Sequence, residues 1–103
     1  MAATLHYNLS GEFATEVIGV GERTRIGSAS FCNTNATLPC FIDMYKKKEG
    51  LGTFYIIKNI KLPAGASFEV SGFNFNNTSE GFNLYVKLTK SASETPTVDL
   101  ILK

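Results

Sequence analysis

The chain has 103 residues, of which 44% are hydrophobic and 18% are charged, and its formal net charge is +1. This length predicts one domain over residues 1–103, and this hydrophobic content excludes a disordered chain. The balance of ten basic against nine acidic residues argues against an electrostatic grip on nucleic acid, which requires a basic face.

The N-terminal residues, 1–6, lack the basic and apolar regions of a signal peptide. No run approaches the roughly 18 apolar residues of a membrane span, so we expect no membrane partner. The expected location is therefore the cytoplasm, either in solution or in a complex, where a disulfide between Cys32 and Cys40 is disfavoured. These two cysteines are interpreted as small buried hydrophobes. His6 is the one histidine, and no Cys-x-x-Cys spacing occurs, so we predict no metal site.

The first half of the chain is typical of strands and loops. Residues 1–9 are interpreted as an extended N-terminal arm, and residues 13–20 are strand-like in composition. Residues 23–33 are rich in small side chains, which favours a central strand with close neighbours. Residues 40–45 alternate between two sets of side chains, which predicts a strand with one buried face.

Three consecutive lysines, Lys46, Lys47 and Lys48, open a loop that we predict over residues 46–52. The two glycines of this loop are consistent with a hairpin into the next strand. The lysines are candidate contacts for an acidic partner or a phosphate. A solvated loop tip is the interpretation that so short a run favours.

Two apolar runs, residues 53–62 and 66–70, flank Pro63-Ala64-Gly65. Proline presets φ at the second position of a β-turn, and glycine suits the position that closes the turn. This stretch therefore predicts a strand, a tight turn and a second strand, arranged as a hairpin.

Phe73 and Phe75 alternate with asparagines at the start of a predicted polar loop, residues 73–81. The favoured interpretation is that both rings cap the core. The alternative is that they contact another subunit, because aromatic anchors dominate interface energies.

Residues 82–90 and 97–102 alternate most clearly and predict the last two strands. No window of 11 residues has helical periodicity. The sequence thus predicts an all-β protein: a single antiparallel β-sandwich, immunoglobulin-like or jelly-roll, with about seven or eight strands and no substantial helix.

No arrangement of residues predicts catalysis, a cofactor or a metal site. A nucleophilic Ser or Cys needs a base within reach, and His6 lies in the N-terminal segment. Neither a phosphate-binding loop nor a calcium-type acidic cluster occurs. Tyr55 and Tyr85, with Phe73 and Phe75, could form a stacking platform for sugars or bases. Without tryptophan or a basic surround, we interpret these rings as core residues.

Three motifs stand out: a strand ending as Ile-x-Ser-x-x-x-x-Asn, a Tyr-x-x-Lys-x-x-x-Leu-Pro-Ala-Gly segment, and a Leu-Tyr-Val strand. The positions are Ile26, Ser28, Asn33, Tyr55, Lys58, Leu62, Pro63, Ala64, Gly65, Leu84, Tyr85 and Val86. Over residues 14–102 the chain resembles small virion structural proteins of tailed bacteriophages. It departs from them at residues 19–22, Gly-Val-Gly-Glu, where the common turn is Val-Pro-Ala-Gly.

The resemblance implies a non-enzymatic virion protein with an immunoglobulin-like or jelly-roll fold. The first expectation is a capsid decoration (cement) protein that binds the outer capsid surface and stabilises the shell. Its partners would be the major capsid protein or other virion proteins and further copies of itself, and its location the virion, after synthesis in the host cytoplasm. The alternatives are a head–tail connector, neck or tail component, and a carbohydrate-binding β-sandwich module. The expected contact elements are the N-terminal arm and the loops at residues 46–52 and 73–81.

Overall fold

The computed structural model describes residues 4–12, 14–19, 25–76 and 81–103. In these residues the chain forms eight β-strands. None of the described residues belongs to a helix long and apolar enough to cross a membrane. The strands are β1 (Leu5–Ser10), β2 (Ala14–Ile18), β3 (Arg25–Asn33), β4 (Cys40–Lys48), β5 (Gly52–Leu62), β6 (Ser67–Asn76), β7 (Asn83–Lys90) and β8 (Thr97–Leu102).

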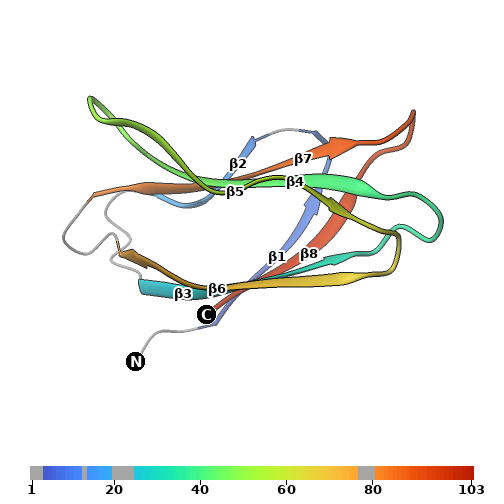
Figure 1. Ribbon diagram of the computed structural model, residues 1–103, viewed down its shortest axis with the longest axis horizontal. Coiled ribbons are helices and arrows are strands. Elements are labelled where there is room, and N and C mark those ends of the chain that lie inside the picture. Colours follow the sequence, from blue (N-terminus) through green and yellow to red (C-terminus); the bar gives the residue numbers. More distant parts are fainter. Residues whose placement is uncertain (1–3, 13, 20–24, 77–80) are drawn as a thin grey trace.

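The strands make two antiparallel four-stranded sheets that face each other (Figure 1). One sheet has the order β1-β8-β3-β6 and the other the order β2-β7-β4-β5. Consecutive strands change sheet at every connection except the one between β4 and β5. This is the strand order of a jelly roll. The expected all-β sandwich is confirmed, and of the two arrangements considered it is the jelly roll.

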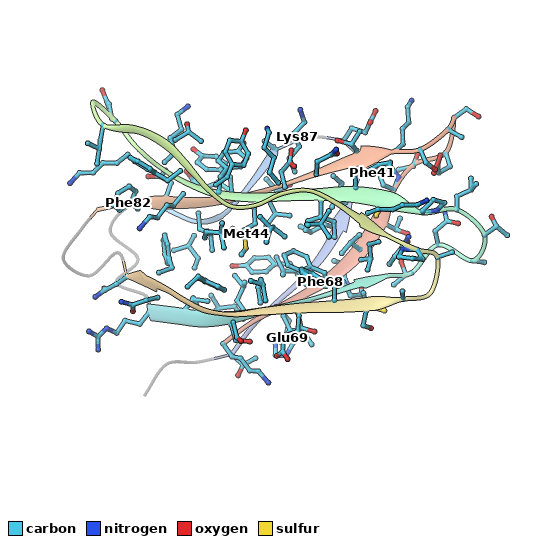
Figure 2. All side chains as sticks on the ribbon, in the orientation of Figure 1. Phe41, Met44, Phe68, Glu69, Phe82 and Lys87 are labelled. Carbon is cyan, nitrogen blue, oxygen red and sulfur yellow. The ribbon has the colours of Figure 1, made fainter. Side chains whose placement is uncertain are left out.

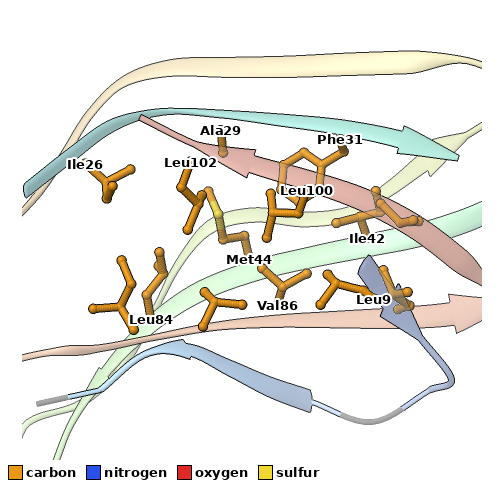
Figure 3. Close-up of a cluster of buried hydrophobic side chains, with 14 of the residues drawn as sticks. Leu9, Ile26, Ala29, Phe31, Ile42, Met44, Leu84, Val86, Leu100 and Leu102 are labelled. Atoms are coloured by element: carbon orange, nitrogen blue, oxygen red, sulfur yellow. The ribbon is translucent and has the colours of Figure 1, made fainter. Parts of the chain in front are cut away.

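The core lies between the sheets and is built from one face of each strand (Figure 3). Met44, Leu84 and Leu100 are fully buried there. Because side chains alternate across a strand, every second residue of β7 and β8 is buried, as the sequence predicts. Burial of this apolar surface is the main force that holds the two sheets together.

The turn at Pro63-Ala64-Gly65 is present, but the predicted hairpin is wrong. The amide of Ala66 donates to the carbonyl of Pro63 at 3.1 Å, and Gly65 has a φ of 72°, a conformation that favours glycine. The strands on either side lie in different sheets, β5 at the edge of one and β6 at the edge of the other. The turn is therefore a corner between the two sheets. A corner and a hairpin use the same turn residues, so the local sequence does not distinguish them.

Asn33 is a buried polar residue, 0% exposed, that ties this corner to its neighbours. Its side-chain amide donates to the carbonyls of Leu38, at 3.1 Å, and Leu62, at 3.0 Å. Its side-chain oxygen accepts from the amide of Asn35 at 2.9 Å. Its backbone carbonyl accepts from the amide of Gly65 at 2.9 Å. One side chain thus joins the end of β3, the β3–β4 loop and the end of β5.

Most of the predicted N-terminal arm is a strand. Residues 5–9 belong to β1, which pairs with β8 from Leu5 opposite Leu102 to Ser10 opposite Thr97. The hydroxyl of Tyr7 donates to the carbonyl of Val17 and so links β1 to β2. Parts of the first three predicted segments lie outside the described residues: residues 1–3 of the arm, residues 13 and 20 of the segment 13–20, and residues 23 and 24 of the segment 23–33.

Candidate interaction surface

The three consecutive lysines lie in a strand, which corrects the predicted loop over residues 46–52. β4 continues to Lys48, because Lys46 and Lys47 still pair with both β5 and β7. The Nζ atoms of Lys46 and Lys48 lie 4.5 Å and 5.8 Å from the centre of the Phe82 ring. Lys47 points to the other side of the strand and is exposed. Only residues 49–51 are left to form the turn.

Phe73 and Phe75 belong to β6 and not to a loop. Phe75 is 1% exposed and lies in the core, so its prediction as a contact with another subunit is wrong. Phe73 is half-buried and packs against the same core. For both rings the core interpretation is confirmed. Residues 77–80 of the predicted loop lie outside the described residues.

Three tyrosines form a row across the outer face of the β2-β7-β4-β5 sheet. Tyr45 of β4 lies directly opposite Tyr85 of β7 and Tyr55 of β5. Its ring centre is 5.4 Å from that of Tyr85, with 12° between the planes, and 5.1 Å from that of Tyr55, with 48° between the planes. We call these three residues the tyrosine row.

The tyrosine row corrects two expectations. Tyr55 is 48% exposed and Tyr85 half-buried, so neither is a core residue. The expected four-ring platform does not form either, because Phe73 and Phe75 lie in the opposite sheet. The third member, Tyr45, alternates with the buried residues of β4, so the sequence places it on the outer face of the strand. Which side chains lie beside it depends on the register of β4 with β5 and β7.

Both ends of the tyrosine row are covered by polar side chains. The Nζ atom of Lys58 lies 4.1 Å from the centre of the Tyr55 ring, a cation–π contact. At the other end the hydroxyl of Tyr85 donates to Glu16 at 3.1 Å, and Asn83 donates to the same carboxylate oxygen. The Tyr45 ring therefore packs against both neighbours and Lys58 lies over the Tyr55 ring, so a partner would meet mainly ring edges, polar groups and the part of Tyr85 that lines an open hollow.

Packing in the row changes its acid–base behaviour. Burial raises the pKa of Tyr45, and the neighbouring Tyr55, Tyr85 and Asp43 add to the rise. Burial also raises the pKa of Tyr85, together with the hydrogen bond and negative charge of Glu16. Both hydroxyls hold their protons more tightly in the folded chain than in the unfolded one.

We expect an alkaline titration followed at 295 nm to show native tyrosines that ionise above the usual pKa of about 10. Since the folded state binds these protons more tightly, their contribution to stability is complete below pH about 10 and is lost as the pH rises through the folded values. Tyr45→Phe should remove one of these late-ionising groups. The guanidinium-unfolded protein is the control, and identical native and unfolded titrations would contradict the expectation.

Lysines are concentrated on the sheet that carries the tyrosine row. Its four strands contain seven lysines and two carboxylates, whereas those of the other sheet contain one arginine and two carboxylates. The lysines are Lys46, Lys47, Lys48, Lys58, Lys61, Lys87 and Lys90. Figure 2 shows Lys87 on the outside of this sheet and Glu69 on the outside of the other. The net charge of +1 thus conceals an uneven distribution of charge between the two sheets, which composition alone could not indicate.

The β4–β5 hairpin extends beyond the body of the sandwich (Figure 1). Near its tip Leu51 is 59% exposed and Phe54 44% exposed. The Phe54 ring meets the Phe82 ring edge-on, with centres 6.1 Å apart. An open hollow of about 580 Å³ lies beside the tip. It is lined by Lys47, Lys48, Glu49, Gly81, Asn83 and Tyr85.

The two cysteines are free thiols in different environments. Cys40 is 1% exposed, as expected, and burial, with a smaller effect of Glu94, raises its pKa. Cys32 is only half-buried. Within the described residues, no three His, Cys, Asp or Glu side chains come together as metal ligands could.

No protein-family model matches the chain, and no curated protein matches it. Among solved structures it is similar to a mitogen from Yersinia pseudotuberculosis, with a TM-score of 0.59 and 16% identity over 100% of this chain and 86% of that one. A weaker likeness is to infectious bursal disease virus, Gt strain, with a TM-score of 0.48 and 12% identity. That match covers 98% of this chain and 30% of the viral chain. At these identities the likeness shows the fold alone.

Proposed function

We propose that this protein is a non-enzymatic structural component of a tailed-bacteriophage virion, and specifically a capsid decoration protein. The observation that carries the proposal is that three large apolar side chains of the β4–β5 hairpin are exposed: Leu51 at the turn, and Phe54 and Tyr55 on opposite faces of β5. Exposed apolar groups that gather at one place, rather than singly, mark surfaces that contact other proteins. Aromatic residues are enriched at such contacts.

Apart from Ser28, the positions that carry the phage resemblance divide into three groups. Ile26, Leu62, Leu84 and Val86 are in the core. Asn33 and the Pro-Ala-Gly corner hold the β3–β4 loop and the β5–β6 connection in place through hydrogen bonds. Tyr55, Lys58 and Tyr85 instead meet on the outer face of one sheet. Core packing does not explain why these three residue types occur at these positions, whereas a surface that contacts another protein does.

In the proposed mechanism the sandwich is a rigid part that binds without chemical change. A standard interface of about 800 Å² per partner would cover roughly one seventh of the protein's 5783 Å² surface. Copies bound across a symmetric shell would bridge neighbouring capsid subunits, so that weak single contacts add up to a stable attachment. Such bridges would oppose the internal pressure of packaged DNA.

Two other functions compete with decoration. A head–tail connector or tail component would use the same kind of surface in a single ring. A carbohydrate-binding module needs free aromatic faces on which a sugar can stack. The rings of Tyr45 and Tyr85 are stacked on each other, and the Tyr55 ring lies under Lys58, which favours a protein partner.

The test is quantitative mass spectrometry of purified virions produced from the genome that encodes this protein. Decoration predicts hundreds of copies per particle and saturable binding of the purified protein to expanded, DNA-free shells. A copy number that fits one ring, with no binding to shells, would identify a connector or tail part instead. Absence from virions combined with binding on a glycan array would support the carbohydrate-binding module.

A further inference from the structure

The tyrosine row is surrounded by lysines. Each of its members has a lysine close to it on its own strand: Lys47 follows Tyr45 by two residues, Lys87 follows Tyr85 by two, and Lys58 lies over the Tyr55 ring. A central aromatic group with a polar rim is typical of a protein–protein interface, and here the rim carries positive charge.

The groups that this face offers are mainly donors. Lysine ammonium groups carry three donors and no acceptor, and aromatic ring edges carry the positive end of the ring quadrupole. Three carboxylates on the same side are already engaged, while Glu49 at the hairpin tip is exposed among the lysines. Glu16 accepts from Tyr85, Glu12 pairs with Lys90 at 3.7 Å, and Asp43 accepts from the amide of Asn59. A complementary partner must therefore supply acceptors, and preferably negative charge.

Nucleic acid would also supply negative charge, but its bases bind by stacking on free aromatic faces. The rings of the row pack against one another and against Lys58. The exposed part of Tyr55, with Leu51 at the hairpin turn, calls instead for apolar side chains on the partner. Phosphates and sugars do not provide these, whereas a protein surface does.

We infer that the outer face of the β2-β7-β4-β5 sheet, with the β4–β5 hairpin tip, docks an acidic protein surface that carries apolar side chains at its centre. The opposite sheet carries negative charge on its strands, at Glu69 and Asp99. Glu69 accepts a hydrogen bond from Ser28, and Asp99 accepts one from Asn8. The inference rests on the proposed function, because it names the face and the partner chemistry that capsid binding would use.

The experiment uses the purified full chain and three probes of matched length: poly-L-glutamate, a random glutamate–tyrosine copolymer, and oligothymidylate. Binding is measured by titration at physiological salt, and the site is mapped by backbone amide shifts. We expect the copolymer to bind more tightly than poly-L-glutamate, with the largest shifts in β4, β5 and β7. Tighter binding of oligothymidylate, shifts centred on β3 and β8, or no binding of any probe would overturn the inference.

A matched pair of double variants tests the charges. Lys58→Gln/Lys87→Gln should weaken copolymer binding by roughly tenfold or more. Arg25→Gln/Lys103→Gln removes the same charge from the other sheet and the residue after β8, and it should change binding less than about twofold. Equal losses in the two variants would show non-specific charge attraction and overturn the inference. Amide spectra of both variants establish that the fold is retained.

The two proposals can fail separately. If the protein decorates shells and Lys58→Gln/Lys87→Gln binds shells as the wild type does, the docking face is wrong while the proposed function stands. If the copolymer results hold and the protein is absent from virions, the docking face stands while the proposed function fails.

Discussion

Phe75→Ala should lower the free energy of unfolding by about 3–5 kcal/mol, because it removes a fully buried ring and leaves a cavity that the two sheets cannot close. Phe75 is 1% exposed and comes from β6, an edge strand of its sheet. Domains of this size typically have a total stability of about 5–15 kcal/mol. The variant should therefore be close to unfolding at 37 °C. Urea titration followed by circular dichroism measures the loss.

Phe41→Ala is the control for this prediction. Phe41 is half-buried and lies on the outside of the opposite sheet (Figure 2), so its truncation removes less buried surface and leaves no enclosed cavity. We expect a loss below about 1.5 kcal/mol. If Phe75→Ala were as stable as Phe41→Ala and lost partner binding instead, Phe75 would be a surface contact and its core position would be refuted.

Asn33→Ala should lower the free energy of unfolding by about 2–4 kcal/mol. The side-chain amide of Asn33 is the donor to the carbonyls of Leu38 and Leu62, and alanine cannot replace it. The bond to Leu62 is buried, so water cannot restore it without opening the corner. At roughly 4–8 °C per kcal/mol for a domain of this size, the midpoint of thermal unfolding should fall by about 10–30 °C.

Asn35→Ala provides the comparison within the same loop. The side-chain oxygen of Asn35 accepts from the amides of Thr37, at 2.9 Å, and Leu38, at 3.0 Å. Water can reach these groups, so we expect a loss of about 0.5–1.5 kcal/mol. Similar losses in the two variants would mean that burial of Asn33 contributes nothing beyond an ordinary loop hydrogen bond.

The strands could be predicted where one face is buried and the alternation is clean. β7 and β8 are the clearest cases, because each alternates between buried and more exposed residues along its length. The fold class followed from these strands and from the absence of helical periodicity. Apart from the β4–β5 hairpin, which the sequence predicts, pairing could not be predicted, because the other pairs join strands far apart in the chain. The same turn chemistry at Pro63 therefore served equally for a hairpin and for a corner between sheets.

The candidate surface was predicted only in part. The run of charge at residues 46–48 identifies the lysines, but local composition indicates a loop there because it does not show the two partner strands that extend β4. Phe75 was ambiguous for a similar reason: a phenylalanine that alternates with asparagines fits both a surface loop and a buried edge strand. The tyrosine row depends on the register of three strands, and register is set by tertiary pairing.

The position of β8 has a consequence for synthesis of the protein. β8 is the last of the eight described strands along the chain, yet it lies in the interior of its sheet, between β1 and β3. While residues 97–102 are still inside the ribosomal exit tunnel, β1 and β3 have no common neighbour and the sheet cannot close. At about 5–20 residues per second, the earlier strands wait for several seconds with apolar faces and strand edges exposed. A nascent chain should therefore depend on chaperones until β8 emerges and the sheet can close.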